Sequence, residues 1–527
     1  MNAVGIDLGT TFSVVAHVDD SGLPAVIPDP AGRPTTPSIV WFDTGEVLIG
    51  EDARSAGIVE PERMVAHIKR FMGTDHTLEF DGVTYTPETI SALILKALAD
   101  NAAAALRRPR GAVAAVVTVP AYFGITEREA TAQAAALAGI DLLDLVAEPV
   151  AAAAFYGVDT AIDGTVLVFD LGGGTFDTTV LRIRPEGPEV LVTEGESHLG
   201  GVDWSERLAA LLLERFTAAA AELDEDDDPT DDENFQEQLT AAADKTKIAL
   251  SQRLSASCVL EYRGRRHTVE LTRADFERAT AHLVENCVAV ADRAIEAARR
   301  RGSGALDRIV LVGGATRMPM IGAALGRHFA VEVCLTEPDL AVAKGAALHA
   351  QSLLAARGDR PLLPAPTTPA ARRALALRPV RTVLPRALGI LIHDSRDPAG
   401  ERRIVHHLVE ANTALPVTGA EHRFATILDG QDRIRVEVYE QAGATASPDL
   451  EHNRRVLDGE LVDVPDLKAG SPIDIALSVG SDGRITCVAV EPKSGRTLTL
   501  ESCIEGVIDA ADADRQRSVV AGTRIQW

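Results

Sequence analysis

Two short segments of the sequence repeat one pattern: an apolar strand, an aspartate, a tight glycine turn and a threonine. They are residues 5–11 (GIDLGTT) and residues 169–175 (FDLGGGT). Only glycine lets a hairpin backbone come close enough to point several N–H groups at phosphate oxygens, and threonine hydroxyls add further donors. Either segment alone is also compatible with an ordinary hairpin, because short glycine patterns are weak motifs. Together they predict the two halves of a phosphate clamp.

The aspartates of the two segments, Asp7 and Asp170, are predicted to face a metal ion. A carboxylate beside a triphosphate is repelled unless Mg²⁺ or its bound waters lie between them. We therefore expect both carboxylates to hold the hydration shell of the ion. A third glycine turn, at residues 313–317 (GGATR), also follows an apolar strand. Three such turns could surround one nucleotide.

Charge and composition exclude several classes of protein. The chain has 52 Lys and Arg against 77 Asp and Glu, a formal net charge of −25, which argues against nucleic acid or an anionic membrane as the main partner. No stretch approaches the roughly 20 unbroken apolar residues of a membrane span, and no signal pattern begins the sequence, so a cytoplasmic protein is expected. The five cysteines are scattered without metal-ligand spacing and are expected to be reduced. The acidic run at residues 222–233 is predicted to be a solvated loop.

The sequence divides into four parts. Residues 1–355 alternate short Val/Ile-rich strands with alanine-rich helical stretches, which predicts an α/β domain, and the repeated turn predicts two similar lobes with a cleft between them. Residues 356–381 are rich in proline and arginine and are predicted to be a linker. Period-two alternation predicts an all-β module at residues 382–505. Residues 506–527 are expected to form a short tail with one helical possibility around residues 506–517 and little else.

The chain resembles the seventy-kilodalton heat-shock (Hsp70, DnaK-like) family of molecular chaperones. Over the first 355 residues the resemblance rests on many motifs in family order and is highly specific. They are residues 5–11, 68–70 (IKR), 117–123 (VTVPAYF), 148–149 (EP), 170–177 (DLGGGTFD), 198–201 (HLGG), 245–248 (KTKI) with 250–251 (LS), and 312–319 (VGGATRMP). The match in the β module is weaker and runs through residues 388–390 (LGI), 412–416 (NTALP) and 482–485 (DGRI).

This resemblance implies an actin-like (ribonuclease H-like) two-lobed ATPase domain followed by a β-sandwich that grips extended apolar polypeptide segments. The implied cofactors are ATP or ADP with Mg²⁺, and K⁺ is a further candidate ion. The implied partners are unfolded or extended polypeptide clients, a J-domain co-chaperone and a nucleotide exchange factor.

The resemblance also assigns roles to individual residues. Lys69 would orient the attacking water and offset charge on the γ-phosphate, in line with the dominance of positioning and charge stabilisation in phosphoryl transfer. Lys247 and Arg317 would stack on the base. The implied catalytic residues are Lys69, Glu148, Asp170, Thr175 and Asp177. The implied nucleotide-binding residues are Gly9, Thr10, Thr11, Gly172, Gly173, Gly174, Gly200, Gly201, Asp244, Lys247, Ser251, Gly313, Gly314, Arg317 and Asp339. The implied interdomain relay is Pro120 with Arg128, and the implied peptide groove is Ile390, Phe424, Ile427, Ile434 and Val436.

Without their neighbouring motifs these residues have plainer interpretations. Lys69 would be a surface lysine, Glu148 a capping or surface carboxylate, and Lys247 with Asp244 an i,i+3 surface pair. Each groove residue is equally compatible with the core of a sandwich.

Several features depart from the family pattern. The Pro/Arg-rich linker replaces a short, leucine-rich, acidic-ended one, and Asp144 stands where the family commonly places a basic residue that senses the linker and the co-chaperone. The helical lid is missing, so bound peptide should leave faster. Residues 394–400 replace the loop that arches over the peptide. Only about 45 residues separate Lys69 from Val117, so one peripheral subdomain is trimmed, as in the short HscC-like paralogues.

Two other functions remain open at this point. A small-molecule kinase of the same superfamily is disfavoured by residues 119–123 and 198–201, and it would release a phosphorylated product other than free phosphate. A nucleotide-gated scaffold that binds one dedicated protein partner would suit the altered linker, arch and lid. A pulldown with ATP and with ADP would separate this scaffold from a chaperone that binds many unfolded chains.

Overall fold

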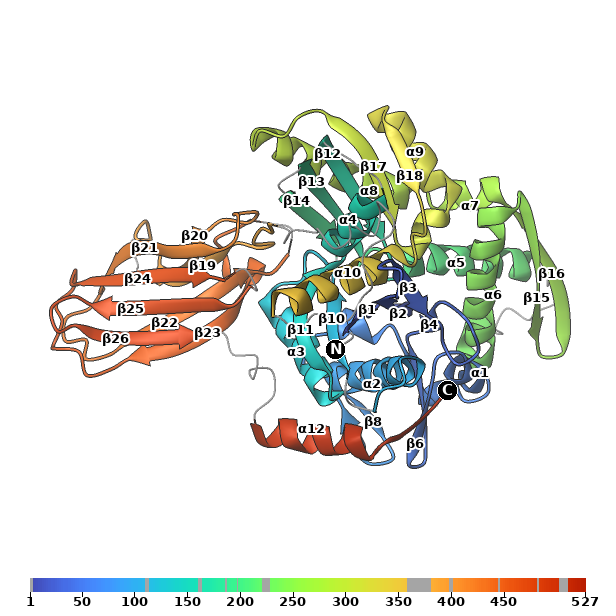
Figure 1. Cartoon of the computed structure of the whole chain (residues 1–527), viewed down its shortest axis with the longest axis horizontal. Coiled ribbons are helices and arrows are strands. Elements are labelled where there is room, and N and C mark those ends of the chain that lie inside the picture. Colours follow the sequence, from blue (N-terminus) through green and yellow to red (C-terminus); the bar gives the residue numbers. More distant parts are fainter. Residues whose placement is uncertain are drawn as a thin grey trace.

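The computed structural model describes residues 3–109, 113–159, 164–184, 187–196, 198–219, 228–357, 381–397, 401–443, 446–480, 483–501 and 510–527. They form an α/β body with an all-β module that projects from one side of it (Figure 1). None of the helices within these ranges combines the length and apolar character needed to cross a bilayer. The predicted linker at residues 356–381 lies almost entirely outside the described residues, as does much of the acidic run and the end of the loop at residues 394–400.

Two sheets with the same strand order form the centre of the body. The first, in the part that we call lobe I (residues 3–147), runs β11-β10-β1-β2-β3, with β4 paired to β2. The second, in lobe II (residues 164–335), runs β18-β17-β12-β13-β14. In both sheets the first three strands pair in parallel and the last three antiparallel. The two similar lobes predicted from the repeated turn are therefore present. The strands are β1 (Ala3–Asp7), β2 (Phe12–Val18), β3 (Pro24–Ile27), β4 (Thr36–Pro37), β10 (Ala114–Val119) and β11 (Asp141–Ala147), then β12 (Gly164–Leu171), β13 (Phe176–Arg184), β14 (Gly187–Glu196), β17 (Leu306–Val312) and β18 (Glu332–Leu335).

Two helices, α4 (Glu148–Asp159) and α10 (Ala341–Ala356), pack against each other between the lobes. Small residues bring their backbones close together: an added Cβ on Gly345 would lie 1.7 Å from the carbonyl oxygen of Ala151, and one on Gly5 would lie 2.2 Å from the amide of Ala347. One apolar core joins both helices to β10 and to β12. The lobes therefore share a tightly packed base.

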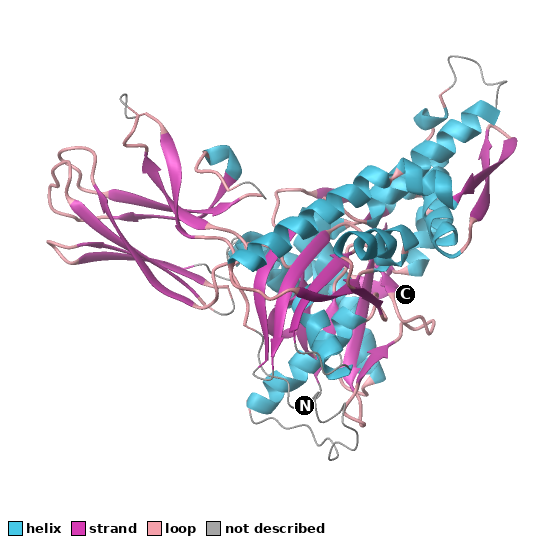
Figure 2. Cartoon of the chain, turned by 90° about the horizontal axis from the view of Figure 1, so that it is seen from above, coloured by secondary structure: helices cyan, strands magenta, loops and turns pink. Residues whose placement is uncertain are grey.

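Smaller elements surround the two sheets (Figures 1 and 2). Lobe I carries a sheet of β5 (Ile39–Asp43), β6 (Glu46–Ile49) and β7 (Met64–Ala66), and a hairpin of β8 (Leu78–Phe80) with β9 (Val83–Tyr85). Lobe II carries the hairpin of β15 (Ser255–Tyr262) and β16 (Arg265–Thr272). The helices are α1 (Glu51–Gly57), α2 (Pro87–Ala105), α3 (Ile125–Leu137), α5 (Gly201–Ala219), α6 (Glu233–Gln252), α7 (Arg273–Ala279), α8 (Ala281–Arg300) and α9 (Pro319–Phe329). Short 3₁₀ turns are η1 (Pro61–Arg63), η2 (Ile68–Phe71), η3 (Pro229–Asp231), η4 (Gly314–Arg317) and η5 (Leu450–His452).

The module consists of two four-stranded sheets that enclose one apolar core. One sheet runs β20-β19-β22-β23 and the other β21-β24-β25-β26, and all their pairings are antiparallel. Alternate residues of β24 and β25 are buried, as period-two patterning predicts. The strands are β19 (Leu388–His393), β20 (Arg403–Val409), β21 (Val417–Ala425), β22 (Ile434–Gln441), β23 (Asn453–Leu461), β24 (Pro472–Val479), β25 (Ile485–Glu491) and β26 (Arg496–Glu501).

The end of the chain differs from the expected short tail. It forms a helix, α12 (Ala510–Gly522), that continues past the predicted stretch, and then a strand, β27 (Arg524–Gln526). The strand pairs with β6 of lobe I. Sequence patterning missed it because three residues are too few to show a period.

Candidate functional site

Five ionisable side chains, four of them buried and Asp7 partly buried, meet where the two lobes face each other. Asp7 ends β1, Asp170 lies near the end of β12, and Asp177 lies on β13 just after the second glycine turn. Glu148 begins α4, and Lys69 lies on η2. The Lys69 ammonium donates a hydrogen bond to Glu148 Oε1 at 2.6 Å, and both side chains are less than one tenth exposed. The structure therefore brings together residues from five separate segments.

The carboxylates of this group carry more negative charge than Lys69 can balance. Burial, followed by the charge of Glu148, raises the pKa of Asp7 to about 7. The same two causes, in the same order, raise the pKa of Asp170 and of Asp177 well above the usual range. Hydrogen bonds hold two of them in place: Thr118 Oγ1 donates to Asp7 at 3.0 Å, and the amides of Ala121 and Tyr122 donate to Asp177. A site of this kind is complementary to a cation.

The first two glycine turns meet directly above these carboxylates. An added Cβ on Gly173 would lie 1.7 Å from Thr11 Oγ1, and one on Gly174 would lie 2.6 Å from Thr10 Cγ2. The Thr11 hydroxyl is buried without a hydrogen-bond partner in the structure, while Thr10 and Thr175 are also buried. Gly9 is equally close-packed, since its Cβ would lie 2.0 Å from a carbonyl oxygen. Glycine therefore lets the two turns pack closely against each other, while their approach to phosphate stays a prediction.

The segment at Gly200 and Gly201 closes over the second turn. The Gly201 amide donates to the carbonyl oxygen of Gly172 at 2.9 Å, and an added Cβ on Gly200 would lie 2.6 Å from the backbone of Gly174. Gly200 donates its own amide to Asp203 Oδ2 at 2.7 Å. Backbone groups of these two segments thus form one continuous wall.

The third turn lies against the second. Gly313 has a φ of 82°, and an added Cβ there would lie 2.3 Å from the carbonyl oxygen of Leu171 and 2.7 Å from Asp170 Oδ1. Next to it, Arg317 Nε donates to Asp339 Oδ2 at 2.7 Å, and Gly314 packs on the same carboxylate.

One face of α6 completes the surroundings. Asp244, Lys247 and Ser251 lie on it at helical spacing. The Lys247 ammonium donates to the carbonyl oxygen of Gly201 at 2.7 Å and to Asp244 Oδ1 at 3.2 Å. The Ser251 hydroxyl donates back to the carbonyl oxygen of Lys247 at 2.9 Å. This face of α6, with Asp244, Lys247 and Ser251, therefore lies beside Gly201 and close to the third turn.

Sequence reasoning gave no role to two residues of this region. Arg70 crosses from η2 to lobe II, where its guanidinium donates to the carbonyl oxygen of Gly174 at 3.1 and 3.2 Å and to Asp203 Oδ2 at 3.2 Å. Ile248 is 57 % exposed on α6, four residues after Asp244 and therefore on the same face. The available signal for Ile248 was a large apolar residue among the polar residues of this helix face. Arg70 had no signal beyond its position next to Lys69.

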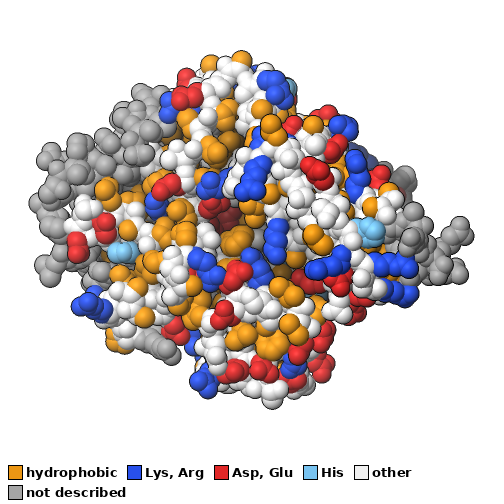
Figure 3. All heavy atoms as spheres, turned by 90° about the vertical axis from the view of Figure 1, so that its right-hand side faces the viewer, with side chains coloured by type: hydrophobic (Ala, Val, Ile, Leu, Met, Phe, Trp, Pro, Cys, Tyr) orange, Lys and Arg blue, Asp and Glu red, His pale blue; other side chains and the backbone are white. Residues whose placement is uncertain are grey.

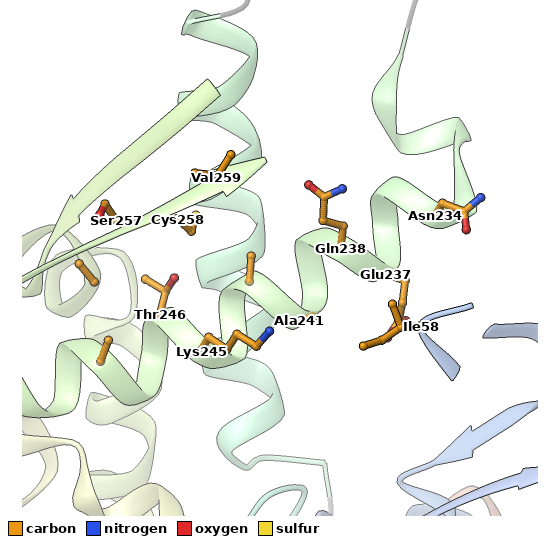
Figure 4. Close-up of a pocket in the computed structure, with 13 residues that line it drawn as sticks. Ile58, Asn234, Glu237, Gln238, Ala241, Lys245, Thr246, Ser257, Cys258 and Val259 are labelled. Atoms are coloured by element: carbon orange, nitrogen blue, oxygen red, sulfur yellow. The ribbon is translucent and has the colours of Figure 1, made fainter. Parts of the chain in front are cut away.

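The molecular surface shows a hollow with acidic side chains in it (Figure 3). Seen from the side on which α6 and β15 lie, the molecule is hollowed near its centre, with acidic side chains deep in the hollow and Lys and Arg around it (Figure 3). A separate cavity of about 680 Å³ lies between α6, β15 and Ile58. Figure 4 shows Lys245, Thr246 and Cys258 pointing into it. Its lining includes none of the predicted site residues.

The predicted interdomain relay lies beside the β module. Pro120 is buried after β10, and the Arg128 guanidinium donates to the carbonyl oxygen of Leu145 at 2.9 Å. On the module side, an added Cβ on Gly483 would lie 3.6 Å from Arg128 Nε. Asp144, the unusual residue on β11, pairs with His349 of α10, with 2.7 Å between Oδ2 and Nε2.

A cluster of four charged residues, which we call the interface cluster, joins α3 to the module. It consists of Glu127 of α3 with Arg386, Glu440 and Arg454 of the module. Arg454 donates to Glu127 Oε1 at 2.8 Å and to Glu440 Oε2 at 2.7 Å, and Glu440, whose side chain is fully buried, accepts the amide of Ile125 at 3.1 Å. Burial raises the pKa of Glu127, but the bonds and charge of Arg454 and Arg386 more than offset this and lower it.

The groove candidates divide by burial. Ile390 and Val436 belong to the module core, and Phe424 and Ile434 are partly buried against it. Ile427 is 51 % exposed after β21, next to Leu428 at 61 %. The structure does not bring all five to one accessible surface.

Comparisons with known proteins agree with the resemblance seen in the sequence. The family model described as "Hsp70 protein" matches residues 3–80 and 75–519. The chain is 36 % identical over 509 residues to the chaperone protein DnaK of Thermotoga petrophila and, equally, to that of Thermotoga maritima, covering 94 % of this chain and 79 % of each relative. DnaK of Thermotoga neapolitana matches to the same extent. Because both comparisons cover nearly all of it, the chain belongs to the Hsp70 family of ATP-hydrolysing molecular chaperones.

Proposed function

We propose that the cleft between lobes I and II binds Mg-ATP and hydrolyses it, and that this controls the grip of the β module on extended apolar polypeptide. The observation that carries the proposal is the buried Lys69–Glu148 pair, surrounded by three further carboxylates and by three glycine turns. In this assignment residues 1–355 are an actin-like ATPase domain, residues 356–381 a linker, residues 382–505 a peptide-binding sandwich, and residues 506–527 a C-terminal segment.

The excess of buried carboxylate makes the cleft suitable for a cation. Asp7 and Asp170 would hold Mg²⁺ through its water ligands. Burial and the charge of neighbouring carboxylates raise the pKa of both side chains, and a divalent ion would offset the repulsion between these carboxylates. Asp177 would lie further from the ion. K⁺ would be a second, weaker occupant. When bound, Mg²⁺ supplies charge neutralisation at the phosphates.

The protein groups around the phosphates have separate tasks. The backbones of the first two turns, with Thr10, Thr11 and Thr175, would donate to phosphate oxygens or to metal-bound water. Lys69 would move partly away from Glu148, so that its ammonium orients the attacking water and stabilises charge on the γ-phosphate. Glu148 would accept a hydrogen bond from that water.

The base would lie between Arg317 and the exposed face of α6. Ile248 offers an apolar surface there, and the flat guanidinium of Arg317 can stack on the opposite face of the base. Asp244 and Lys247 would contact the ribose. Gly200 and Gly201 would close over the β-phosphate.

For the module, the accessible candidates Phe424, Ile427 and Ile434 would contact the client, and Ile390 and Val436 would shape the groove from below. A J-domain co-chaperone, a nucleotide exchange factor and a cytoplasmic location are part of the same proposal. The comparisons give no support to the kinase or to the dedicated-partner scaffold.

Single-turnover hydrolysis of ATP by the whole chain tests the site. Lys69→Ala should abolish hydrolysis while ATP still binds, because the lysine acts on the transition state more than on the ground state. Lys69→Gln keeps a donor for Glu148 and should also be inactive, which separates lost charge from lost structure. Lys96→Ala is the matched control, since Lys96 pairs with Asp100 on α2, away from the cleft. Equal turnover in the parent and in both Lys69 variants would refute the assignment.

Coupling to the module needs a second measurement. A short, extended, leucine-rich peptide at saturating concentration should accelerate hydrolysis in the parent chain. An unchanged rate would contradict the proposed control of the module by the cleft, without affecting the assignment of the ATPase site.

A further inference from the structure

The segment that follows the β module returns to the ATPase body and lies on lobe I. We call residues 510–527, which comprise α12 and β27, the C-terminal strap. Figure 1 shows α12 running below α2 and α3, with the C-terminus beside β6 and α1. α12 packs against both α2 and α3. The strap thus contacts the same lobe as the interface cluster, at a separate place.

Apolar side chains anchor the strap. Val520 is fully buried in the core of lobe I, and Val519, Ile525 and Trp527 pack against the same core. A polar contact fixes the helix as well, because Thr89 Oγ1 of α2 donates to Gln516 Oε1 at 2.9 Å. The contact therefore has the character of a packed interior.

The strand extends a sheet of lobe I. β27 pairs in parallel with β6, with Arg524 opposite Glu46, Ile525 opposite Val47 and Gln526 opposite Leu48. The Gln526 side chain also donates to Glu46 Oε2 at 2.6 Å. Without β27, β6 would be the edge of the sheet β6-β5-β7 and would present unpaired backbone groups.

The strap has a mechanical consequence for the module. The start of the module contacts both lobes: the Val190 amide of lobe II donates to the carbonyl oxygen of Arg381 at 2.8 Å, and Arg386 pairs with Glu127 of α3 in lobe I. The last module strand ends at Glu501 and the strap begins at Ala510. Nine Cα-to-Cα steps span at most about 30 Å when fully extended. While the strap is docked, the end of β26 must stay within that distance of α12.

We infer that the C-terminal strap is an internal tether that, while it is docked, keeps the end of the β module within reach of lobe I. The module can leave the interface cluster without releasing the strap, but movement beyond the reach of the strap requires its release. This inference concerns the range of domain movement and does not depend on the assignment of the ATPase residues.

A pair of neighbouring substitutions in the full chain tests it. Val520→Asp places a charge in the lobe I core and should release the strap, whereas Ala521→Asp adds the same group at the exposed next position. Amide exchange in residues 46–49 should rise at least about tenfold in Val520→Asp and stay at the parent rate in Ala521→Asp. The radius of gyration in solution with ADP should increase in Val520→Asp alone. Exchange that rises without any increase in radius, with ADP and with ATP, would overturn the tether and leave the strap as a local stabiliser.

Adding the segment back provides a second test. A labelled peptide of residues 510–527 should bind the Val520→Asp chain and restore slow exchange in residues 46–49, but it should not bind the parent, whose site is filled. Equal binding to both chains, or to neither, would overturn the inference. If Val520→Asp does not fold, Ile525→Pro removes only the strand pairing and should speed exchange in residues 46–49 while α12 stays docked.

Discussion

Removal of the Arg454 guanidinium should separate the β module from lobe I. Arg454 lies between Glu127 and Glu440, and the four charges of the interface cluster sum to zero. In Arg454→Ala, the cation of the interface cluster that remains beside the fully buried Glu440 is Arg386, whose nitrogen lies 3.9 Å from the carboxylate. Breaking a buried ion pair by removing one partner costs about 3 to 5 kcal/mol. Because 28 % of the Arg454 side chain is exposed, we take the lower end, which corresponds to roughly a hundredfold change in the docking equilibrium.

The amide of Ile125 is a direct probe of this change. It donates to Glu440 Oε1 in the docked structure and loses that acceptor when the module leaves. Hydrogen exchange at this amide should therefore become about a hundredfold faster in Arg454→Ala, if exchange occurs from the undocked form. Gly124→Ala should act in the same direction without any change of charge, because its Cβ would lie 2.3 Å from a Glu440 carboxylate oxygen and 2.6 Å from Arg454 Nη2.

A second arginine of the same hairpin is the control. Arg435 makes an ion pair with Asp458 across β22 and β23, but the two side chains are 54 % and 32 % exposed. Pairs of this kind contribute little, so Arg435→Ala should leave exchange at Ile125 unchanged. The reasoning would be refuted if Arg454→Ala and Arg435→Ala gave the same exchange rate at this amide.

Two further predictions concern stability. Gly345→Ala should lower the free energy of unfolding by about 1 to 3 kcal/mol, because its Cβ would press on the backbone of Ala151. Thermal or urea denaturation measures this change. In the control Gly322→Ala the Cβ meets nothing closer than 3.7 Å, so this variant should be neutral or slightly stabilising. Burial, with the charge of Glu440, raises the pKa of Glu129 from 4.5 to about 7. The folded chain therefore holds a proton that the unfolded chain has lost between these values, so stability should fall as the pH rises from about 4.5 to 7. Glu129→Gln should flatten that part of the stability profile, and an unchanged slope would contradict the assignment.

The parts of the fold that could be predicted from the sequence are those in which the signal is local. Each of the first two glycine turns carries its strand, carboxylate and threonine within a few residues, so the repeat of this pattern was visible in the sequence. The alternation in residues 382–505 predicted strands for the same reason. The Lys69–Glu148 pair spans 79 positions, and no period connects its members. Its prediction depended on the family resemblance.

The charged residues at the module interface show what alternation leaves undetermined. In β22, residues 434, 436, 438 and 440 share one face, and three of them are apolar. Glu440 is thus a carboxylate at a position where the alternation of the strand predicts an apolar residue. This signal is visible in the sequence, but it does not show which residues Glu440 contacts. Its charged partners are Arg386 and Arg454 of the module, and the amide that it accepts is that of Ile125 on α3, 315 positions earlier. The same face explains why Val436 lies in the module core.

The pairing of β27 with β6 also sets an order of events during synthesis. Arg524 and its partner Glu46 are 478 positions apart, since 524 − 46 = 478. At translation rates of about 5 to 20 residues per second, β6 emerges from the ribosome roughly 25 to 95 seconds before the strand that covers it. During that interval the growing chain carries an open sheet edge, which is a template for pairing with other chains. This chaperone should therefore depend on protection of its own nascent lobe I until residues 524–526 are made.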